Sequence, residues 1–330
     1  MRELRCGLAL SAVLLTMAFS SPAQEGKEAF AFLRYPTSAH INALGGEAVS
    51  LTDKDASAVL HNPGLLGGEM SGTLQLSYLS YLADIHFGSV LYTRAQGERG
   101  AWAVAASYLN YGSIAESLYD GSLTGARVSA QDVAFEVAYG YDLSERWRGG
   151  LAMKCIYSSF AEYTAMGLAA DMGVSYYNDE KTLSFGLAAK NLGAQLTTYE
   201  GNSRQPLPFD LQMGMSYRLA HAPIRLTLTA VSLHRWRFDQ PSSSATTDGN
   251  GRTFFKHMVM GVDLAPTDNF YLAVGFNPRR HFDLEIQNAN FFGGFSAGAG
   301  IRIRRFGLSL SVANYHPSAT SLMFSLAIKL

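Results

Sequence analysis

DVAFEVAYGY, residues 132–141, alternates large apolar residues with small or polar ones at every step. Strict alternation predicts a β-strand whose two faces meet two different environments. The same pattern recurs from residue 72 to residue 330, for example in 73–81, 209–218 and 322–329. We find about 14 such segments, and an even number of strands is typical of bacterial outer-membrane barrels.

The connections between these segments alternate between short and long. Short turns are expected near 96–97, 144–145, 178–179, 220–221, 266–267 and 304–305, and long connections at 112–129, 193–207, 237–253 and 278–292. Short periplasmic turns opposite long outer loops are typical of an outer-membrane barrel, whereas a soluble β-sandwich has no reason to keep this parity. We therefore predict an all-β fold, a transmembrane antiparallel β-barrel of about 14 strands over residues 72–330, which pairs its backbone amides within lipid.

The first 23 residues are typical of a secretory signal peptide. Arg2 and Arg5 precede an apolar core at 8–19, and Ser21-Pro22-Ala23 fits a cleavage site. The alternative, a membrane anchor, is disfavoured because the apolar core is short. We expect export through the Sec pathway, cleavage near Ala23 and localisation in the outer membrane.

Residues 24–71 differ in character from the rest of the chain. They are rich in Gly, Ala and short polar residues, without sustained alternation. An acidic residue of Asp53-Lys54-Asp55 can cap a short helix over 56–60, which Asn62-Pro63-Gly64 would end. This segment is too short for an independent domain, and we expect it to lie inside the barrel as a plug.

Charged residues recur on the small-residue face of the predicted strands. Each would be costly if it faced lipid, so we expect them to face the lumen. There they can form a structural network with one another and with the plug, which we favour over the alternative of a charged transport path. These residues are Glu136, Arg148, Lys154, Asp171, Lys190, Asp210 and Arg218.

The sequence contains no recognisable catalytic set. The eight histidines are scattered without the spacing of metal ligands. Gly298-Ala299-Gly300 precedes a strand rather than the helix that a dinucleotide loop requires, so we assign it to close packing or bending of the barrel. A net charge of −1 without a basic cluster argues against nucleic acid. We expect no enzyme, no cofactor and no metal, with a Ser or His site at the outer rim as the alternative.

Residues 44–63 carry a motif. Leu44-Gly45-Gly46 is followed by the acidic, Ala-rich stretch 55–59 and then by Asn62-Pro63. This order resembles the N-terminal signature of the FadL-like outer-membrane barrels, and the motif residues are Gly45, Gly46, Asn62 and Pro63. Gly64 departs from the pattern, because FadL-type transporters usually carry alanine after Asn-Pro.

Within this family the mature chain is similar to the PorQ-type barrels of the type IX secretion system of Bacteroidetes. The resemblance rests on FLRYPTSAH at 32–40, ALGG at 43–46, Asn62-Pro63 and GFSAGAGIR at 294–302. It implies a plugged barrel that tethers a PorZ-like surface protein, in one complex with the sortase PorU and the shuttle barrel PorV, which attaches cargo to lipopolysaccharide. The alternative is a FadL-like transporter of hydrophobic compounds, which needs an apolar lumen pocket and a lateral opening.

Overall fold

The computed structural model describes residues 28–330 except 53–54, 83, 118–122, 179, 181, 200–202, 237, 239–248, 268, 284–292 and 317–318. The predicted signal peptide, residues 1–23, and residues 24–27 therefore lie outside the described residues. No helix in the described part of the chain combines the length and the apolarity needed to cross a membrane.

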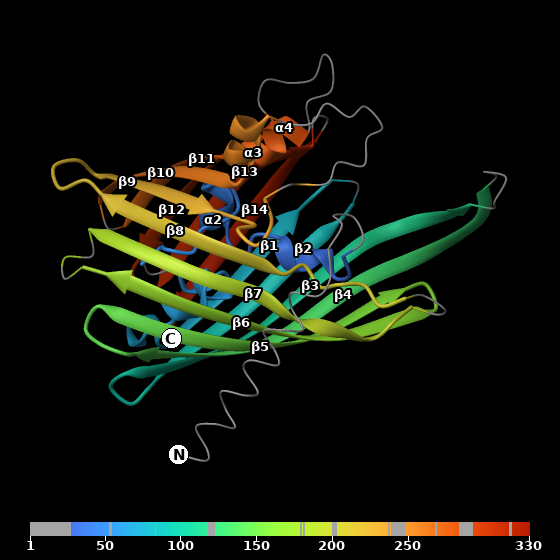
Figure 1. Ribbon diagram of the computed structural model, residues 1–330, viewed down its shortest axis with the longest axis horizontal. Helices are drawn as coiled ribbons and strands as arrows, with labels where there is room; N and C mark the ends of the chain where they lie inside the picture. The colour runs from blue at the N-terminus through green and yellow to red at the C-terminus, as the bar shows by residue number, and fades with distance from the viewer. Residues whose placement is uncertain are drawn as a thin grey trace.

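Fourteen antiparallel strands of the described residues form a closed barrel (Figure 1). Each strand pairs with its neighbours in sequence, and β1 pairs with β14 to close the ring, in the register Leu74↔Ile328. The predicted fold class is confirmed. The strands are β1 (Thr73–Ser80), β2 (His86–Gln96), β3 (Gly100–Ser117), β4 (Leu123–Asp142), β5 (Trp147–Phe160), β6 (Tyr163–Tyr177), β7 (Leu183–Thr197), β8 (Asp210–Arg218), β9 (Ile224–Ala230), β10 (Met258–Thr267), β11 (Phe270–Phe276), β12 (Phe295–Ile303), β13 (Phe306–His316) and β14 (Ala319–Lys329).

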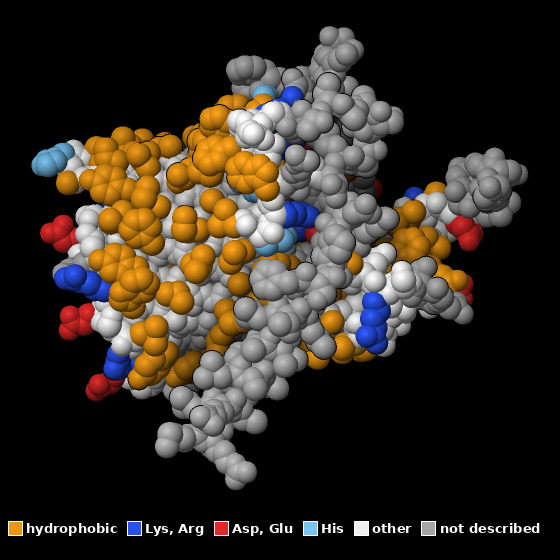
Figure 2. All heavy atoms as spheres, in the orientation of Figure 1, with side chains coloured by type: hydrophobic (Ala, Val, Ile, Leu, Met, Phe, Trp, Pro, Cys, Tyr) orange, Lys and Arg blue, Asp and Glu red, His pale blue; other side chains and the backbone are white. Residues whose placement is uncertain are grey.

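Alternation along the strands sorts side chains between the outside and the lumen. Phe135 and Val137 are 62% and 58% exposed, whereas Ala134 and Glu136, which alternate with them along the strand, are buried. Hydrophobic side chains cover much of the visible outer face, and charged side chains gather at the end that carries the short turns (Figure 2). An apolar exterior around a polar, filled interior suits a barrel in lipid.

The short turns lie where the sequence predicts them, but one predicted long loop is wrong. β3 and β4 do not leave the sheet at 112–129; they continue as a paired ribbon, in the register Ser113↔Ser129 and Ile114↔Val128. The alternation fades there because both faces of the ribbon are exposed, so no face selects apolar residues. β7 likewise extends to Thr197, into the predicted loop 193–207.

Two short helices lie at the end opposite the short turns. They are α3 (Asn250–Lys256) and α4 (Pro278–Asp283), within the predicted long connections 237–253 and 278–292. Lys256 Nζ lies 2.9 Å from Asp283 Oδ1 and joins the two helices. Residues 239–248 and 284–292 of these connections lie outside the described residues.

Residues 28–71, called the plug below, cross the interior of the barrel (Figure 1). Asp55 caps the turn at 56–60 as predicted, since its Oδ1 accepts a hydrogen bond from Ser57 N at 3.1 Å. Asn62 ends that turn and caps the next one. The helical turns of the plug are η1 (Ala31–Arg34), α2 (Ala39–Ala43), η2 (Ala56–Leu60), η3 (Pro63–Leu65) and η4 (Gly68–Met70).

Candidate functional site

The plug meets the barrel wall through inward-facing glycines. A Cβ atom on Gly150 would lie 2.1 Å from Pro63 O, and one on Gly186 would lie 1.9 Å from Val49 O. The atoms that it would meet belong to the backbone, which cannot rotate away, so the wall requires glycine there. We call the inward glycines that contact the plug the glycine belt. The nearest plug atom belongs to the backbone at Gly140, Gly150, Gly186 and Gly275, and to a side chain at Gly173, Gly214, Gly261 and Gly298.

Gly45 and Gly46 of the sequence motif form a left-handed turn against the wall. Their φ angles are +101° and +95°, which residues with a side chain rarely adopt. Gly45 O accepts hydrogen bonds from Arg280 Nη1 at 3.1 Å and from Asn277 Nδ2 at 3.3 Å. The Gly-Gly motif therefore fastens the plug to the region of α4.

Asn62 and Pro63 form the second part of the motif and organise the centre of the plug. Asn62 Nδ2 donates to Val49 O at 2.7 Å, and Asn62 Oδ1 accepts from Gly64 N at 2.9 Å. A Cβ atom on Gly64 would lie 2.7 Å from the carbonyl carbon of Gly173. An alanine at position 64 would therefore clash with the backbone of the wall.

A buried ion-pair cluster lies on the wall beside the plug. Lys154 Nζ lies 2.6 Å from Asp171 Oδ2, 3.0 Å from Asn191 Oδ1 and 3.8 Å from Glu136 Oε2. A bulge in β7 places Asn191 at φ +58°, and its N–H donates to Asp171 Oδ1 at 2.7 Å. Three of the predicted lumen charges are thus brought together; Lys154 pairs closely with Asp171, whereas Glu136 lies farther away and its Oε1 has no hydrogen-bond partner among the described residues.

Lys190 connects the wall to the plug. Its Nζ lies 3.6 Å from Glu47 Oε2, and His61 Nδ1 lies 3.2 Å from the same oxygen. Burial by itself raises the pKa of the Glu47 carboxyl, but Lys190 and His61 more than offset this and hold that pKa below its usual value. Burial and the charge of Lys190 lower the pKa of His61, which therefore favours the neutral imidazole.

Arg148 forms a second connection between wall and plug, near the short turns. Its guanidinium lies 2.8 Å from Glu69 Oε1 of the plug and 2.5 Å from Asp142 Oδ1 of the wall. Arg148 Nη1 also donates to Leu65 O at 3.1 Å. One buried cation thereby holds both the plug and the neighbouring strand.

The two remaining predicted lumen charges differ in their surroundings. Asp210 is buried, and its carboxylate accepts from Ser232 N at 2.7 Å and from Gln212 Nε2 at 2.8 Å. Arg218 is exposed at the end of β8 and lines a cavity instead of joining the buried network.

That cavity, called the vestibule below, lies at the end with the short turns and has a volume of about 400 Å³. Its wall includes His40, whose Nε2 lies 2.7 Å from Asp263 Oδ1, and Arg225, whose Nη2 lies 2.8 Å from Asp263 Oδ2. The same wall also carries apolar side chains such as Ile224, Phe270 and Ile301, so the lining of the vestibule is mixed.

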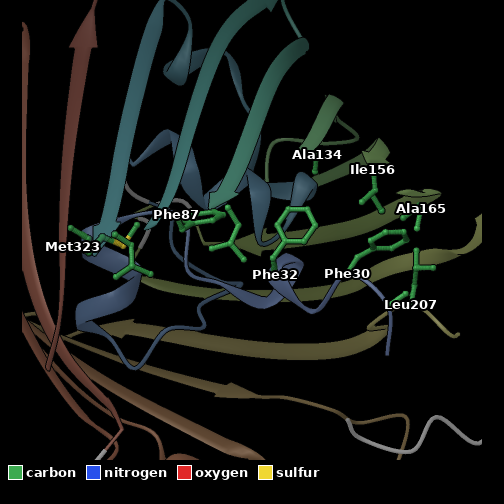
Figure 3. Close-up of a cluster of buried hydrophobic side chains, with 13 residues drawn as sticks. Phe30, Phe32, Phe87, Ala134, Ile156, Ala165, Leu207 and Met323 are labelled. Atoms are coloured by element: carbon green, nitrogen blue, oxygen red, sulfur yellow. The ribbon is translucent and has the colours of Figure 1, made fainter. Parts of the chain in front are cut away.

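An apolar cluster fills the opposite half of the lumen (Figure 3). Phe30 and Phe32 of the plug point toward Ile156, Phe87 and other wall side chains, and Phe32 is only 2% exposed. The cavity beside Phe32 and Glu136 has a volume of about 30 Å³, roughly the room of one water molecule. This small cavity is too small for a hydrocarbon ligand.

Several of these residues escaped the sequence interpretation. The plug acids Glu47 and Glu69, the His40–Asp263–Arg225 set and most of the glycine belt carry no local motif. For the glycine belt, the sequence does carry one signal: glycines recur at inward positions of successive strands. Among the described residues, no group of three or more His, Cys, Asp or Glu side chains is placed to hold a metal ion.

No protein-family model and no curated protein sequence matches the chain. Solved structures match the fold. The toluene transporter TodX of Pseudomonas putida aligns with a TM-score of 0.53 at 10% identity, over 89% of this chain and 97% of that one. The CymD monoaromatic hydrocarbon channel aligns at 0.52 and 10% identity, over 89% and 96%. A Pseudomonas aeruginosa FadL homologue aligns at 0.50 and 10% identity, over 88% and 97%. The chain thus has the fold of the FadL-like outer-membrane channels.

Proposed function

We propose that this chain is a non-enzymatic outer-membrane barrel that anchors a protein at the cell surface. The observation that carries the proposal is the firmly held plug: the glycine belt and the ion pairs clamp it, the apolar cluster closes the outer half, and the vestibule of about 400 Å³ lies on the short-turn side of it. A lumen of this kind suits a scaffold better than a conduit. The partner suggested by the sequence resemblance is a PorZ-like protein, in a type IX secretion attachment complex with PorU and PorV.

The non-enzymatic part of the proposal has separate support. The buried acids and bases beside the plug are engaged in ion pairs between wall and plug, as at Lys154–Asp171 and Arg148–Glu69. The matched barrels are named as channels and transporters, which also fits a protein without chemistry of its own.

The test is to tag the mature chain after Ala23, extract outer membranes gently and probe the purified barrel for the PorZ-like protein, PorU and PorV. We expect the PorZ-like protein to co-purify, and to be released from cells that lack the barrel. The loop variants are the barrels without 239–248 or without 284–292, which keep α3 and α4; they should assemble, and they should lose the partner if these loops hold it. A barrel recovered alone from cells that express all three proteins would contradict the proposal.

A second candidate is transport of small hydrophobic compounds, and the structural relatives fit it at least as well as the first. Two of them are named as channels or transporters of aromatic hydrocarbons. The apolar cluster is the region of this lumen with suitable chemistry. Uptake of radiolabelled toluene by cells with and without the barrel tests it: uptake that depends on the barrel favours transport, and equal uptake opposes it.

A further inference from the structure

The barrel wall is short at β9 and β11. Each of these strands has 7 residues, whereas β4 has 20. Seven residues extend about 23 Å along a strand, or about 18 Å across the membrane at a tilt of about 40°. The apolar band of an outer-membrane barrel is about 25 Å tall. β9 and β11 therefore leave part of this band to another element of the chain.

α3 lies at the outer end of this short wall. It leads into β10, which pairs with both β9 and β11. The side of α3 that is turned inward carries Thr253 and Lys256, and His257 follows on the same side; all three are buried. Phe254 and Phe255 on the other side are 48% and 49% exposed. A surface helix in water buries its apolar side and exposes its polar side, and α3 does the reverse.

Polar contacts fix the inward side of α3. Lys256 Nζ lies 2.9 Å from Asp283 Oδ1 of α4. The imidazole of His257 lies between two carbonyl groups, with Nδ1 2.7 Å from Val231 O and Nε2 3.1 Å from Trp236 O. Rotation of α3 to bury its two phenylalanines would break a buried ion pair, which is costly. The fold therefore holds these phenylalanines on the outside.

Neighbouring side chains extend the apolar side of α3 into a patch. Trp236 stacks on the His257 ring with centroids 5.4 Å apart and is 53% exposed, and Leu233 is 43% exposed. Met260, the next outward residue of β10, is also exposed. Figure 2 shows hydrophobic side chains over α3 as well as over β9 and β10. The patch thus continues the apolar outer face of the barrel. We call it the outer patch; it comprises Leu233, Trp236, Phe254 and Phe255.

We infer that the outer patch is embedded in the outer leaflet of the membrane and binds the acyl chains of its lipids. Three observations carry the inference: the height missing at β9 and β11, the reversed sides of α3, and the continuity of the patch with the lipid-facing wall. Tryptophan at the edge of such a band is typical of the membrane–water interface. In water, an apolar patch of this kind would favour aggregation.

This lipid contact goes beyond the proposed function, because it does not require a surface partner. It also limits where that partner binds, since the outward side of α3 is then occupied by lipid. The two ideas fail separately: the barrel can anchor a protein with the outer patch in water, and the outer patch can lie in lipid without any partner.

The test is electron paramagnetic resonance on the full-length barrel in phospholipid vesicles, with a spin label at Phe255→Cys. The exposed native cysteine is first removed by Cys155→Ser. Oxygen partitions into lipid, whereas a charged nickel complex stays in water. We expect the label at 255 to collide more with oxygen than with nickel, as a label at Val137→Cys on the lipid-facing wall does. A label at Glu145→Cys in a short turn gives the opposite order, and the same order at 255 would overturn the inference.

A second readout leaves α3 unchanged. Trp102→Phe with Trp147→Phe makes Trp236 the single tryptophan of the chain. We expect its fluorescence to fall at least about twofold in vesicles whose acyl chains are brominated, because the outer patch contacts those chains. Unchanged fluorescence in assembled barrels would overturn the inference. Access of nickel to position 255 that disappears only when the purified PorZ-like protein is added would assign the patch to that protein and overturn the lipid contact.

Discussion

The two halves of the lumen hold the plug by different mixtures of contacts, although apolar clusters occur in both. Toward the short turns, the plug is clamped by backbone packing on the glycine belt and by ion pairs such as Arg148–Glu69. Toward the outer loops, residues 28–35 pack Phe30 and Phe32 into the apolar cluster. Apolar contacts are not directional and any apolar group can replace them, whereas the ion pairs cannot separate without leaving buried charges. Exchange with a ligand is therefore expected only in the apolar half.

The largest effect is expected at the glycine belt. Gly150→Ala places a Cβ atom about 2.1 Å from Pro63 O, so the plug cannot pack against the wall at this position. We expect the barrel to fail to assemble around its plug, because overpacking against backbone cannot relax. Gly88→Ala is the control, since the nearest atom to its Cβ is at 3.7 Å. Heat-modifiable migration on gels measures the assembled fraction, and normal assembly of Gly150→Ala would contradict the role of the belt.

The next effect is expected at the buried ion-pair cluster. Lys154→Met leaves Asp171 buried without its cation, and we expect a loss of about 3–5 kcal/mol. Arg218→Met is the matched control: Arg218 is exposed in the vestibule, so its change is expected to stay within about 0.5 kcal/mol. Urea unfolding in detergent measures both, and equal losses would show that burial does not distinguish these charges.

A smaller effect is expected in the apolar cluster. Phe32→Ala should cost about 3 kcal/mol through lost burial and the cavity that remains. Because that cavity is apolar, added benzene or toluene should raise the melting temperature of Phe32→Ala more than that of the native chain. Lys154→Met should show no such rescue. Absence of rescue would mean that the apolar half collapses instead of opening.

The smallest effect is a dependence of stability on pH that differs between the two halves. His61 has a lowered pKa, so below about pH 6.5 the unfolded chain binds a proton that the folded plug excludes, and stability falls. The lowered pKa of Glu47 extends this loss below about pH 4.5. Burial raises the pKa of Glu28 at the apolar half, so its protonation on acidification works in the opposite direction and favours the folded state.

Melting temperatures between pH 7.5 and 4.5 measure the net dependence. We expect a decrease on acidification that His61→Gln reduces between pH 6.5 and 5. A melting temperature that rises toward acid in the native chain would mean that buried carboxyls such as Glu28 outweigh the Glu47–His61 pair.

The local sequence pattern predicted much of the fold. The predictions that were wrong, such as the loop at 112–129, have a physical cause. Alternation in stretches such as 132–141 predicted the strands because lipid and lumen select opposite residues at successive positions. The same rule fails for 112–129, since a ribbon with water on both faces imposes no alternation. The Asp55 cap was readable because its hydrogen bond to Ser57 spans only two residues.

The sequence by itself determined the barrel, its strand number, its short turns and the capped turn of the plug. Each of these depends on neighbours along the chain or on the solvent that a face meets. Only the tertiary structure decided which charges pair. It also decided that Lys190 forms an ion pair with Glu47 and that Gly150 packs against Pro63. The last two contacts join residues 143 and 87 positions apart, and closure of the barrel around the plug brings them together.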